Sequence, residues 1–477
     1  MAHAPKPILV WFRQDLRLAD NPALAAAVKD GPVIPVFILD DETPGKWKTG
    51  SAARWWLHYS LEALAADLAK RGSNLILRRG KADKVIDDLI RETDAQAVYW
   101  NRLYEPYAIA RDTAIKASLE EHGMKVRSFN AALLVEPWTI KTGSDGPYKV
   151  FTPFWRTAAS LVEDATPLPA PRTIDAPAKW PRSDELTAWR LLPSKPNWAQ
   201  GFSALWTPGE TGARKRLSAF IDKSLDHYAD DRDRPDKPAT SRLSPHLHWG
   251  EIGPRQVWRA MQTAKEENPR TERHVTKFLS EIGWREFSHH LLYHFPTLPE
   301  RNYRSQFDAF PWERDNHAFK AWTQGRTGYP IVDAGMRELW ATGTMHNRVR
   351  MVAASFLIKH LMIPWQRGEE WFWDTLVDAD LANNAASWQW VAGSGADAAP
   401  YFRIFNPVVQ GEKFDPDGAY VRRWVRELKH CGPRFIHRPW QSSNFAALAY
   451  EKPIVDHDRA RTRALAAYKS ISDAAGN

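Results

Sequence analysis

From residue 8 to about 135, short apolar runs alternate with longer stretches whose apolar residues recur every three or four positions. The short runs are rich in branched and aromatic residues, which favours strands, and the stretches between them are typical of helices. The expected strands are 8–12, 33–39, 75–77, 97–100 and 126–129, and the expected helices are 22–29, 51–71, 81–92 and 106–122. This alternation predicts an α/β domain over residues 6–135, built on a doubly wound parallel sheet.

Residues 136–208 differ in character. They hold many of the chain's 34 prolines and show no long helical period, which indicates an extended interdomain linker that wraps over the surface. From residue 209 to 477, apolar residues again recur at three- and four-residue spacing, so an all-α C-terminal domain is expected. Its predicted helices include 214–224, 272–294, 332–341, 347–361 and 368–374, and the last helical stretch should end near residue 469.

The composition narrows the class of protein. At 477 residues, 43% of them hydrophobic, the chain can form two or three domains with substantial cores. The mean hydropathy is -0.51, and no apolar run approaches the roughly 20 residues that a membrane-spanning helix needs. With no signal-peptide pattern at the N-terminus, we expect a cytoplasmic protein. A lone Cys431 excludes a disulfide framework and any multi-cysteine zinc or iron–sulfur site.

Charge and tryptophan content suggest the kind of partner. Lysine and arginine number 65 against 57 acidic residues, a net charge of +8, and the sequence pI is near 9.3. This basicity is compatible with a polyanion such as nucleic acid. The 24 tryptophans exceed what core packing usually requires. Indole rings stack on planar ligands and can also transfer electrons.

Three expected helices each place an aromatic or thioether side chain beside polar groups on one face, through i+3 and i+4 spacing. The three sets are Asn347, Arg350 and Met351; Asp380, Asn384 and Trp388; and Glu281, Trp284 and Arg285. Any one set could be an ordinary amphipathic face with salt bridges. All three together fit that interpretation less well, because carboxylates and amides beside bulky rings cost energy unless a polar ligand satisfies them. They favour a site for a large planar heteroaromatic ligand with hydrogen-bonding edges.

Other segments are less specific. The polar stretch TSRLS at 240–244 precedes a helix-like segment and could hold a phosphate, although an ordinary capping loop would look the same. GSGADA at 393–398 matches a dinucleotide fingerprint on paper, but it follows a helical stretch rather than a strand, so we expect a loop. The histidine pairs at 246/248 and 289/290 lack the partners of a zinc site, and no metal is expected.

Several long motifs resemble the DNA photolyase/cryptochrome family. They are VWFRQDLR at 10–17, TSRLS at 240–244, EIGWREF at 281–287, GRTGYP at 325–330, MHNRVRM at 345–351, WQW at 388–390 and NP at 406–407. The resemblance covers essentially the whole chain and is most like a bacterial cyclobutane pyrimidine dimer photolyase. It implies a photolyase fold: an N-terminal α/β domain, a wrapping linker and a helical domain that holds FAD. The pattern of the chain predicts the same three parts.

The resemblance also implies a function. Reduced anionic FAD, excited by light, would donate an electron to a cyclobutane dimer flipped out of UV-damaged DNA, and the dimer would split. The implied catalytic residues are Glu281, Asn347, Asn384, Trp284, Trp390 and Met351. The implied FAD contacts are Tyr228, Thr240, Ser241, Arg242, Leu243, Ser244, Phe278, Glu281, Arg285, Asn347, Arg350, Asp378, Asp380 and Asn384. The implied DNA contacts are Arg232, Glu281, Trp284, Asn347, Arg348, Trp390, Arg403 and Gln410.

Individual roles follow from the same resemblance. The indoles of Trp284 and Trp390 would pack against the flipped dimer, and the carboxyl group of Glu281 would stabilise its radical anion. Arg350 would pair with Asp378 beside the flavin. Electrons that restore the reduced flavin would travel along Trp388 nearest the flavin, Trp365 in the middle and Trp312 at the surface.

The subfamily can be argued from single positions. Asn347 stands where relatives that repair (6-4) photoproducts carry histidine, which favours cyclobutane dimers. Asn384 stands where plant cryptochromes carry aspartate, so the reduced anion is favoured. The stretch NRLYEP at 101–106 is closer to class III photolyases and plant cryptochromes than to class I, and both classes remain open.

Two rival functions and an antenna pigment also follow from these patterns. A cryptochrome-type photoreceptor would share the fold and FAD without repair activity, and a tryptophan-rich nucleic-acid-binding module would have neither FAD nor catalysis. A folate, 5,10-methenyltetrahydrofolate, is the expected antenna, with Trp47, Asn101 and Glu105 as candidate contacts. We expect a monomer that acts on damaged DNA and does not bind membranes.

Overall fold

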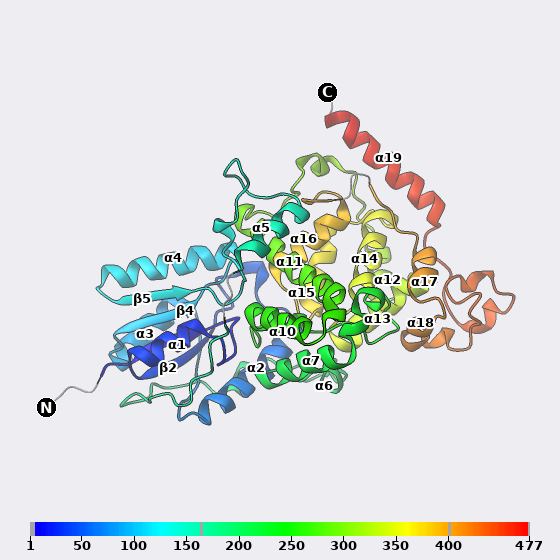
Figure 1. The fold of residues 1–477 in the computed structure, drawn as a ribbon. Coiled ribbons are helices and arrows are strands. Elements are labelled where there is room, and N and C mark those ends of the chain that lie inside the picture. The colour runs from blue at the N-terminus through cyan, green and yellow to red at the C-terminus, as the bar shows by residue number, and fades with distance from the viewer. Residues whose placement is uncertain (1–4, 163–165, 399–401, 476–477) are drawn as a thin grey trace.

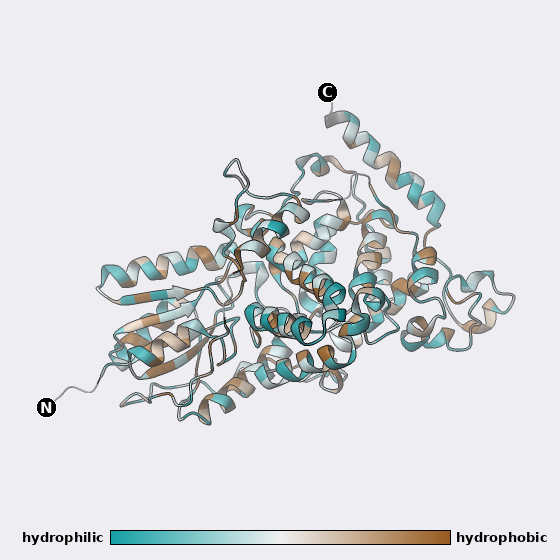
Figure 2. Ribbon diagram, in the orientation of Figure 1, coloured by the Kyte–Doolittle hydropathy of each residue, from teal (hydrophilic) through white to brown (hydrophobic). Residues whose placement is uncertain are grey.

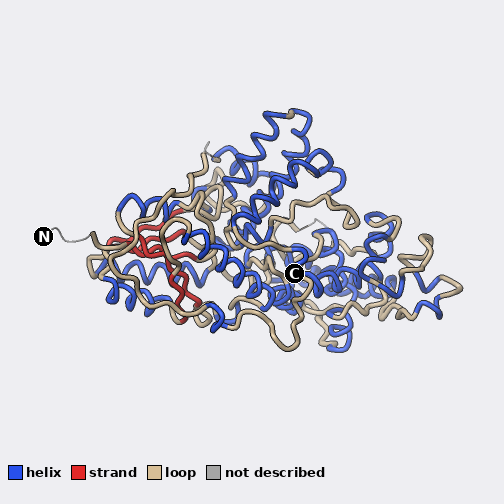
Figure 3. Tube along the Cα trace, turned by 90° about the horizontal axis from the view of Figure 1, so that it is seen from below, coloured by secondary structure: helices blue, strands red, loops and turns tan. Residues whose placement is uncertain are grey.

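The computed structural model describes residues 5–162, 166–398 and 402–475. The chain forms an α/β region at its N-terminal end and a larger helical region that follows it (Figure 1). Viewed from below, all strands gather at the N-terminal end of the molecule, and the remainder is helix and loop (Figure 3). The predicted fold class is therefore confirmed.

The sheet contains five parallel strands in the order β3-β2-β1-β4-β5. The strands are β1 (Ile8–Phe12), β2 (Val33–Leu39), β3 (Ile76–Arg79), β4 (Ala97–Asn101) and β5 (Lys125–Phe129). The connecting helices are α1 (Pro22–Asp30), α2 (Ser51–Ala69), α3 (Ala82–Thr93) and α4 (Pro106–Glu121). The chain runs outward from β1 to β3 and then returns to β4 on the other side of β1. This reversal makes the sheet doubly wound, as predicted.

Alternation along β1 separates the two faces of the sheet. Ile8, Val10 and Phe12 pack in one core with α1 and α2, whereas Leu9 and Trp11 pack in another with α3 and α4. Both cores are fully buried, which explains why the strands read as continuous apolar runs. Figure 2 shows hydrophobic colour on the strands, in contrast to the largely hydrophilic α19 (His457–Ala475) at the far edge of the molecule.

The linker is less extended than its prolines suggest. It contains α5 (Phe151–Leu161), a helix that the sequence analysis did not predict. Pro153 lies in the first turn of this helix, where its missing N–H leaves no hydrogen bond unmade. Phe154 and Ala158 are buried against α11 (Glu272–His294), with the rings of Phe154 and Phe287 5.0 Å apart. Tertiary packing therefore decides that this proline-containing segment is helical.

The helical region supplies the remaining elements. These are α6 (Phe202–Leu205), α7 (Glu210–Lys223), α8 (Tyr228–Asp231), α9 (Ser244–His248), α10 (Pro254–Glu267), α11, α12 (Asn316–Thr323), α13 (Pro330–Thr342), α14 (Asn347–Ser355), α15 (Trp365–Thr375), α16 (Leu381–Ala392), α17 (Pro407–Phe414), α18 (Ala419–Trp424) and α19. The single helix predicted at 347–361 is instead α14 followed by a π-helical turn, Phe356–His360. The last helix also runs past the expected end near residue 469. Within the described residues, no helix has the length and apolar character to cross a bilayer.

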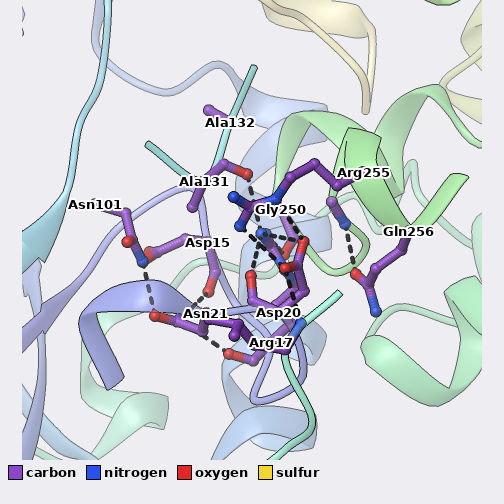
Figure 4. Close-up of polar contacts among 12 residues, drawn as sticks. Asp15, Arg17, Asp20, Asn21, Asn101, Ala131, Ala132, Gly250, Arg255 and Gln256 are labelled. Atoms are coloured by element: carbon purple, nitrogen blue, oxygen red, sulfur yellow. Dashed lines mark hydrogen bonds and ion pairs between the residues drawn. The ribbon is translucent and has the colours of Figure 1, made fainter. Parts of the chain in front are cut away.

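A buried polar network joins the α/β and helical regions (Figure 4). Its centre is Arg17, whose side chain is 1% exposed and follows β1. The guanidinium donates to the carbonyl oxygens of Gly250 at 2.9 Å, Asp20 at 2.7 Å and Ala131 at 2.9 Å. Arg255 of α10 donates to the Asp20 carboxylate at 2.9 Å. One arginine thus links the loop after β1, the segment after β5 and the helical region.

Close backbone approach accompanies this network. Gly250 has a φ of +64°, and a Cβ atom there would lie 2.1 Å from the carbonyl oxygen of Gln14. The backbone N–H of Leu16 also donates to Trp249 O at 3.0 Å. Only glycine permits both the conformation and the contact. The loop after β1 therefore sits directly on the chain that leaves α9.

Candidate functional site

A cavity of about 620 Å³ lies among α8, α9, α11, α14 and α16. This volume is typical of small-molecule and cofactor sites, which span ~300–1,000 Å³. Each of the three polar-aromatic helix faces contributes to its wall. The lining includes Glu281, Trp284, Arg285, Asn347, Arg350, Met351, Asp380, Asn384, Trp388 and Trp390. Three faces that lie on separate helices between residues 281 and 388 therefore form one site.

The predicted FAD contacts mostly line this cavity. Beyond the three faces, Tyr228, Ser241, Leu243, Ser244, Phe278 and Asp378 belong to its wall. Thr240 and Arg242 do not, although they lie in the same loop. Arg242 has a left-handed φ of 52°, and burial lowers the pKa of its guanidinium while Glu338 opposes that effect.

Arg350 and Asp378 form the expected pair. The Arg350 guanidinium donates to both Asp378 carboxylate oxygens, at 3.1 and 2.9 Å. The Ser244 hydroxyl donates to the same carboxylate at 2.6 Å. Since Ser244 begins α9, this contact joins the 240–244 loop to the wall of the cavity. The ion pair and the loop are thus one hydrogen-bonded unit.

Asp380 and Asn384 are positioned by α16. Asp380 caps the helix through its Oδ1, which accepts the backbone N–H of Asn383 at 2.7 Å. Burial alone would raise the pKa of Asp380, but His289 and His248 lower it well below its usual range. The Asn384 amide donates to the carbonyl oxygen of Glu369 at 3.0 Å, which orients it at the cavity wall.

Two indoles face the open part of the site. Trp284 is backed by Phe151 of α5, with ring centroids 3.8 Å apart and planes within 7° of parallel. The Trp390 ring nitrogen donates to the carbonyl oxygen of Asp397 at 3.0 Å. Phe151 was missed by the sequence analysis because its segment was read as an irregular linker. Its apolar spacing with Phe154 and Ala158 was the available signal.

Several predicted DNA contacts are engaged in ion pairs within the protein. Arg232 pairs with Glu281, which also receives the Lys277 ammonium at 3.0 Å. Arg348 pairs with Asp233 at 2.6 Å. The pair of Arg232 with Glu281 places a cation beside the carboxyl group at the edge of the cavity.

A second hollow of about 520 Å³ adjoins the first and shares Asp233 and Arg348 with it. Arg403 and Gln410, both predicted DNA contacts, line it together with Arg234 and Lys413, which were not predicted. Clustered basic side chains beside a cavity with stacking rings are typical of nucleic-acid interfaces. Their sequence signal is weak, since arginine and lysine are common throughout the chain.

The three candidate electron-transfer tryptophans belong to one apolar cluster of the helical region. Trp388 lines the cavity, and its ring lies so close to Gly368 that a Cβ there would be 2.2 Å from the indole. Trp365 is fully buried one turn before Gly368 in α15 and donates to Asn302 at 2.8 Å. Trp312 is half-buried, with its ring 4.4 Å from that of Phe310. It is therefore less exposed than expected.

The antenna candidates lie away from both hollows. The Asn101 amide, 2% exposed, donates to Asp15 at 2.5 Å and to Asn21 at 2.8 Å, and accepts the N–H of Ala23 at 3.2 Å (Figure 4). These side chains fill the carboxyl edge between β1 and β4, where a doubly wound sheet usually binds its ligand. The amide of Asn101 is thus hydrogen-bonded within the protein, and its contact with an antenna stays a prediction.

The other two antenna candidates have different surroundings. Glu105 is buried and accepts from Gln14 at 3.3 Å, beside the same edge of the sheet. Trp47 is buried against Trp373, with ring centroids 5.4 Å apart, and Lys46 lies over its ring at 4.8 Å. No group of three or more histidine, cysteine or acidic side chains in the described part of the chain is arranged to hold a metal ion.

Comparison with known proteins gives consistent matches along the chain. The family model described as DNA photolyase matches residues 8–172, and the FAD binding domain of DNA photolyase matches residues 278–470. A deoxyribodipyrimidine photo-lyase of Agrobacterium fabrum is 54% identical, with 98% of each chain covered. Cryptochrome-2 of Arabidopsis thaliana is 41% identical, over 96% of this chain and 78% of that protein.

A solved structure agrees with these matches. The crystal structure of a bacterial class III photolyase from Agrobacterium tumefaciens superposes with a TM-score of 0.95 at 53% identity, covering 99% of both chains. Full-length similarity at this identity extends over the sheet, the linker and the cavity alike. The chain therefore belongs to the DNA photolyase family.

Proposed function

We propose that this protein is a deoxyribodipyrimidine photo-lyase that repairs cyclobutane pyrimidine dimers in DNA with the help of light. The observation that carries the proposal is the meeting of three polar-aromatic helix faces in one cavity, with two indoles and a carboxyl group at its edge. FAD fits this wall because the cavity offers amide, carboxylate and guanidinium groups to a planar heteroaromatic ring system. Bound and reduced, FAD supplies the electron that light drives into the dimer.

The proposed role of each residue follows from its position in the cavity. Trp284, held flat by Phe151, and Trp390 offer apolar surfaces to an unstacked pyrimidine dimer. Extruding a damaged base pair costs a few kcal/mol, less than for an intact pair, which favours lesions. Glu281 accepts from Arg232 and pairs with Lys277, so two cations lie beside the place where negative charge would develop on the dimer. When protonated, the carboxyl group of Glu281 would itself donate to the dimer.

Electrostatics would bring the DNA to this cavity. Arg403, Gln410, Arg234 and Lys413 line the adjoining hollow, where the arginine and lysine side chains would replace the counterions of the DNA phosphates. Arg348, at the border of the two hollows, would exchange its partner Asp233 for a phosphate. The protein would thereby place the lesion over the first cavity.

The finer assignments rest on single residues. Asn347 at the cavity wall favours cyclobutane dimers over (6-4) photoproducts, and the resemblance of 101–106 favours class III over class I. We further propose a folate, 5,10-methenyltetrahydrofolate, as antenna near Trp47 or Glu105, a cytoplasmic location with the protein on the nucleoid when bound to DNA, and a monomer.

A repair assay tests the function directly. The purified protein with reduced FAD is illuminated with DNA that carries one defined thymine cyclobutane dimer, and restored thymines are counted per absorbed photon. A (6-4) lesion serves as the substrate control and darkness as the reaction control. Light-dependent repair of the first lesion alone is expected. A flavin-containing protein that repairs neither lesion would instead behave as a cryptochrome-type photoreceptor.

Mutation of Glu281 tests the role of the site. Glu281→Ala should keep FAD and bind damaged DNA, yet lose much of its repair per absorbed photon. Glu272→Ala is the matched control, because Glu272 lies on the same helix but is exposed and pairs only with Lys265 at 3.0 Å among the ion pairs of the described residues. Equal repair by Glu281→Ala and the unmodified protein would remove this carboxyl group from the mechanism.

A further inference from the structure

The carboxylate of Asp380 faces two histidines that the repair mechanism above does not use. Its Oδ1 is taken by the backbone N–H and the side-chain amide of Asn383, both at 2.7 Å. Its Oδ2 lies 3.4 Å from His289 Nε2 and 3.9 Å from His248 Nδ1. Both rings are buried and come from different helices, α11 and α9. An acid at the cavity wall is thus enclosed by two imidazoles.

Hydrogen-bond geometry determines the charge of His289. Its Nδ1 lies 3.0 Å from the carbonyl oxygen of Arg285, which can only accept, so Nδ1 carries a proton. Its Nε2 faces the Asp380 carboxylate, which also accepts. A neutral imidazole has one N–H, and both ring nitrogens donate only in the imidazolium form. Since each nitrogen faces an acceptor, this geometry favours the imidazolium form of His289 beside a carboxylate.

The charges around this pair support the assignment. Burial lowers the pKa of His289, but the Asp380 carboxylate more than offsets it and raises the pKa overall, while Arg285 opposes that rise. Glu286, the next residue along α11, lies 3.5 Å from Arg285 and also faces His289. Tyr104 of the α/β region packs against His289 in a T-shaped arrangement, with ring centroids 6.4 Å apart. The cluster is therefore a compact arrangement of alternating charges.

We propose that His289 is a positioning residue that keeps Asp380 as a carboxylate within a buried ion pair, and that this pair makes the cavity prefer anionic reduced flavin over oxidised flavin. The inference rests on the proposed binding of FAD. With the imidazolium present, the pair adds no net negative charge to the cavity wall. Without it, Asp380 keeps a negative charge that His289 no longer compensates, and this charge repels an anionic ligand. That change lowers the preference for the reduced anion.

Redox titration of the FAD-loaded protein measures this preference. The shift of the flavin potential on binding gives the ratio of affinities for reduced and oxidised FAD. His289→Gln keeps a hydrogen-bond donor but loses the positive charge. The ratio of the affinities for reduced and oxidised FAD should therefore fall about tenfold, the change in an equilibrium constant that one pKa unit represents. His290→Gln is the matched control. This neighbour is also buried on α11, but its Nε2 accepts the backbone N–H of Tyr148 at 3.1 Å.

A second measurement does not depend on the variants. Nitrogen NMR of the unmodified holoprotein reports the protonation of each histidine ring, and His289 should show both nitrogens protonated at neutral pH. A neutral His289, or an affinity ratio that His289→Gln and His290→Gln change alike, would overturn the proposal. A protein that takes up no FAD would overturn the proposed function as well. A protein that binds FAD with an unchanged ratio would contradict only the ion-pair inference.

Discussion

Replacing Arg17 by methionine tests whether the buried network holds the two regions together. Methionine keeps much of the length of the side chain but removes the charge and all three hydrogen bonds to the carbonyl oxygens of Gly250, Asp20 and Ala131. Asp20 is itself 1% exposed and would retain only the pair with Arg255. The variant therefore leaves a buried carboxylate and three buried carbonyl groups with fewer donors.

The size of the effect follows from two opposing contributions. Three hydrogen bonds from a charged donor stabilise by roughly 1.5–3 kcal/mol each. Several kcal/mol of this loss are offset, because the methionine variant has no guanidinium to transfer from water into the interior. The cost of that transfer is visible in Arg17 itself, whose pKa is lowered by burial. Breaking a buried pair by removing one partner costs about 3–5 kcal/mol, and we expect Arg17→Met to fall in that range. Such a loss is a large fraction of the ~5–15 kcal/mol by which domains are stable.

Urea unfolding followed by circular dichroism and by tryptophan fluorescence is the assay. Both regions contain tryptophan, so a weakened junction should appear as two separated transitions where the unmodified protein has one. Arg79→Met is the matched control, because Arg79 pairs with Asp41 at 3.0 Å but its side chain is 52% exposed. The control should lose at most about 1 kcal/mol. A loss for Arg17→Met no larger than that of the control would refute the reasoning.

The other predictions concern the cavity and its surroundings. Phe151→Ala removes the ring that stacks on Trp284 and should lower the binding preference for dimer-containing over intact duplex. The loss, measured by competition binding, should reach at most the ~1–3 kcal/mol of one base–aromatic stack. An unchanged preference would show that Trp284 holds its orientation without the stack. Burial raises the pKa of Glu286 from 4.5 to about 7, so between these pH values the folded state binds more protons than the unfolded state. The free energy of unfolding should therefore fall by up to about 3 kcal/mol as the pH rises from 4.5 to about 7. Glu286→Gln should remove that slope in urea titrations, and a slope that persists would assign it to other groups. Trp388→Phe should fold, bind FAD and repair after chemical reduction, yet fail to photoreduce in blue light with a thiol donor, and normal photoreduction would mean that electrons take another path.

Local pattern determined the architecture and the three helix faces. The sheet and helix 272–294 agree with the sequence prediction because continuous apolar runs and helical spacings are properties of the chain itself. The same spacing placed Glu281 with Trp284, and Asp380 with Asn384, on single faces. The three faces together favoured a ligand site, but nothing in a local pattern states how the helices that carry them pack together.

Tertiary structure alone decided the contacts between distant segments. Phe151 backs Trp284 from a proline-containing segment whose helix is stable only against α11. The loop after β1 folds back onto the amide of Asn101, and Arg232 lies against Glu281 although 49 residues separate them. Such pairings depend on how helices and loops pack against one another. The free energy of this packing is the sum of many weak contacts between residues far apart in sequence. A linear sequence specifies these contacts only through the folded whole.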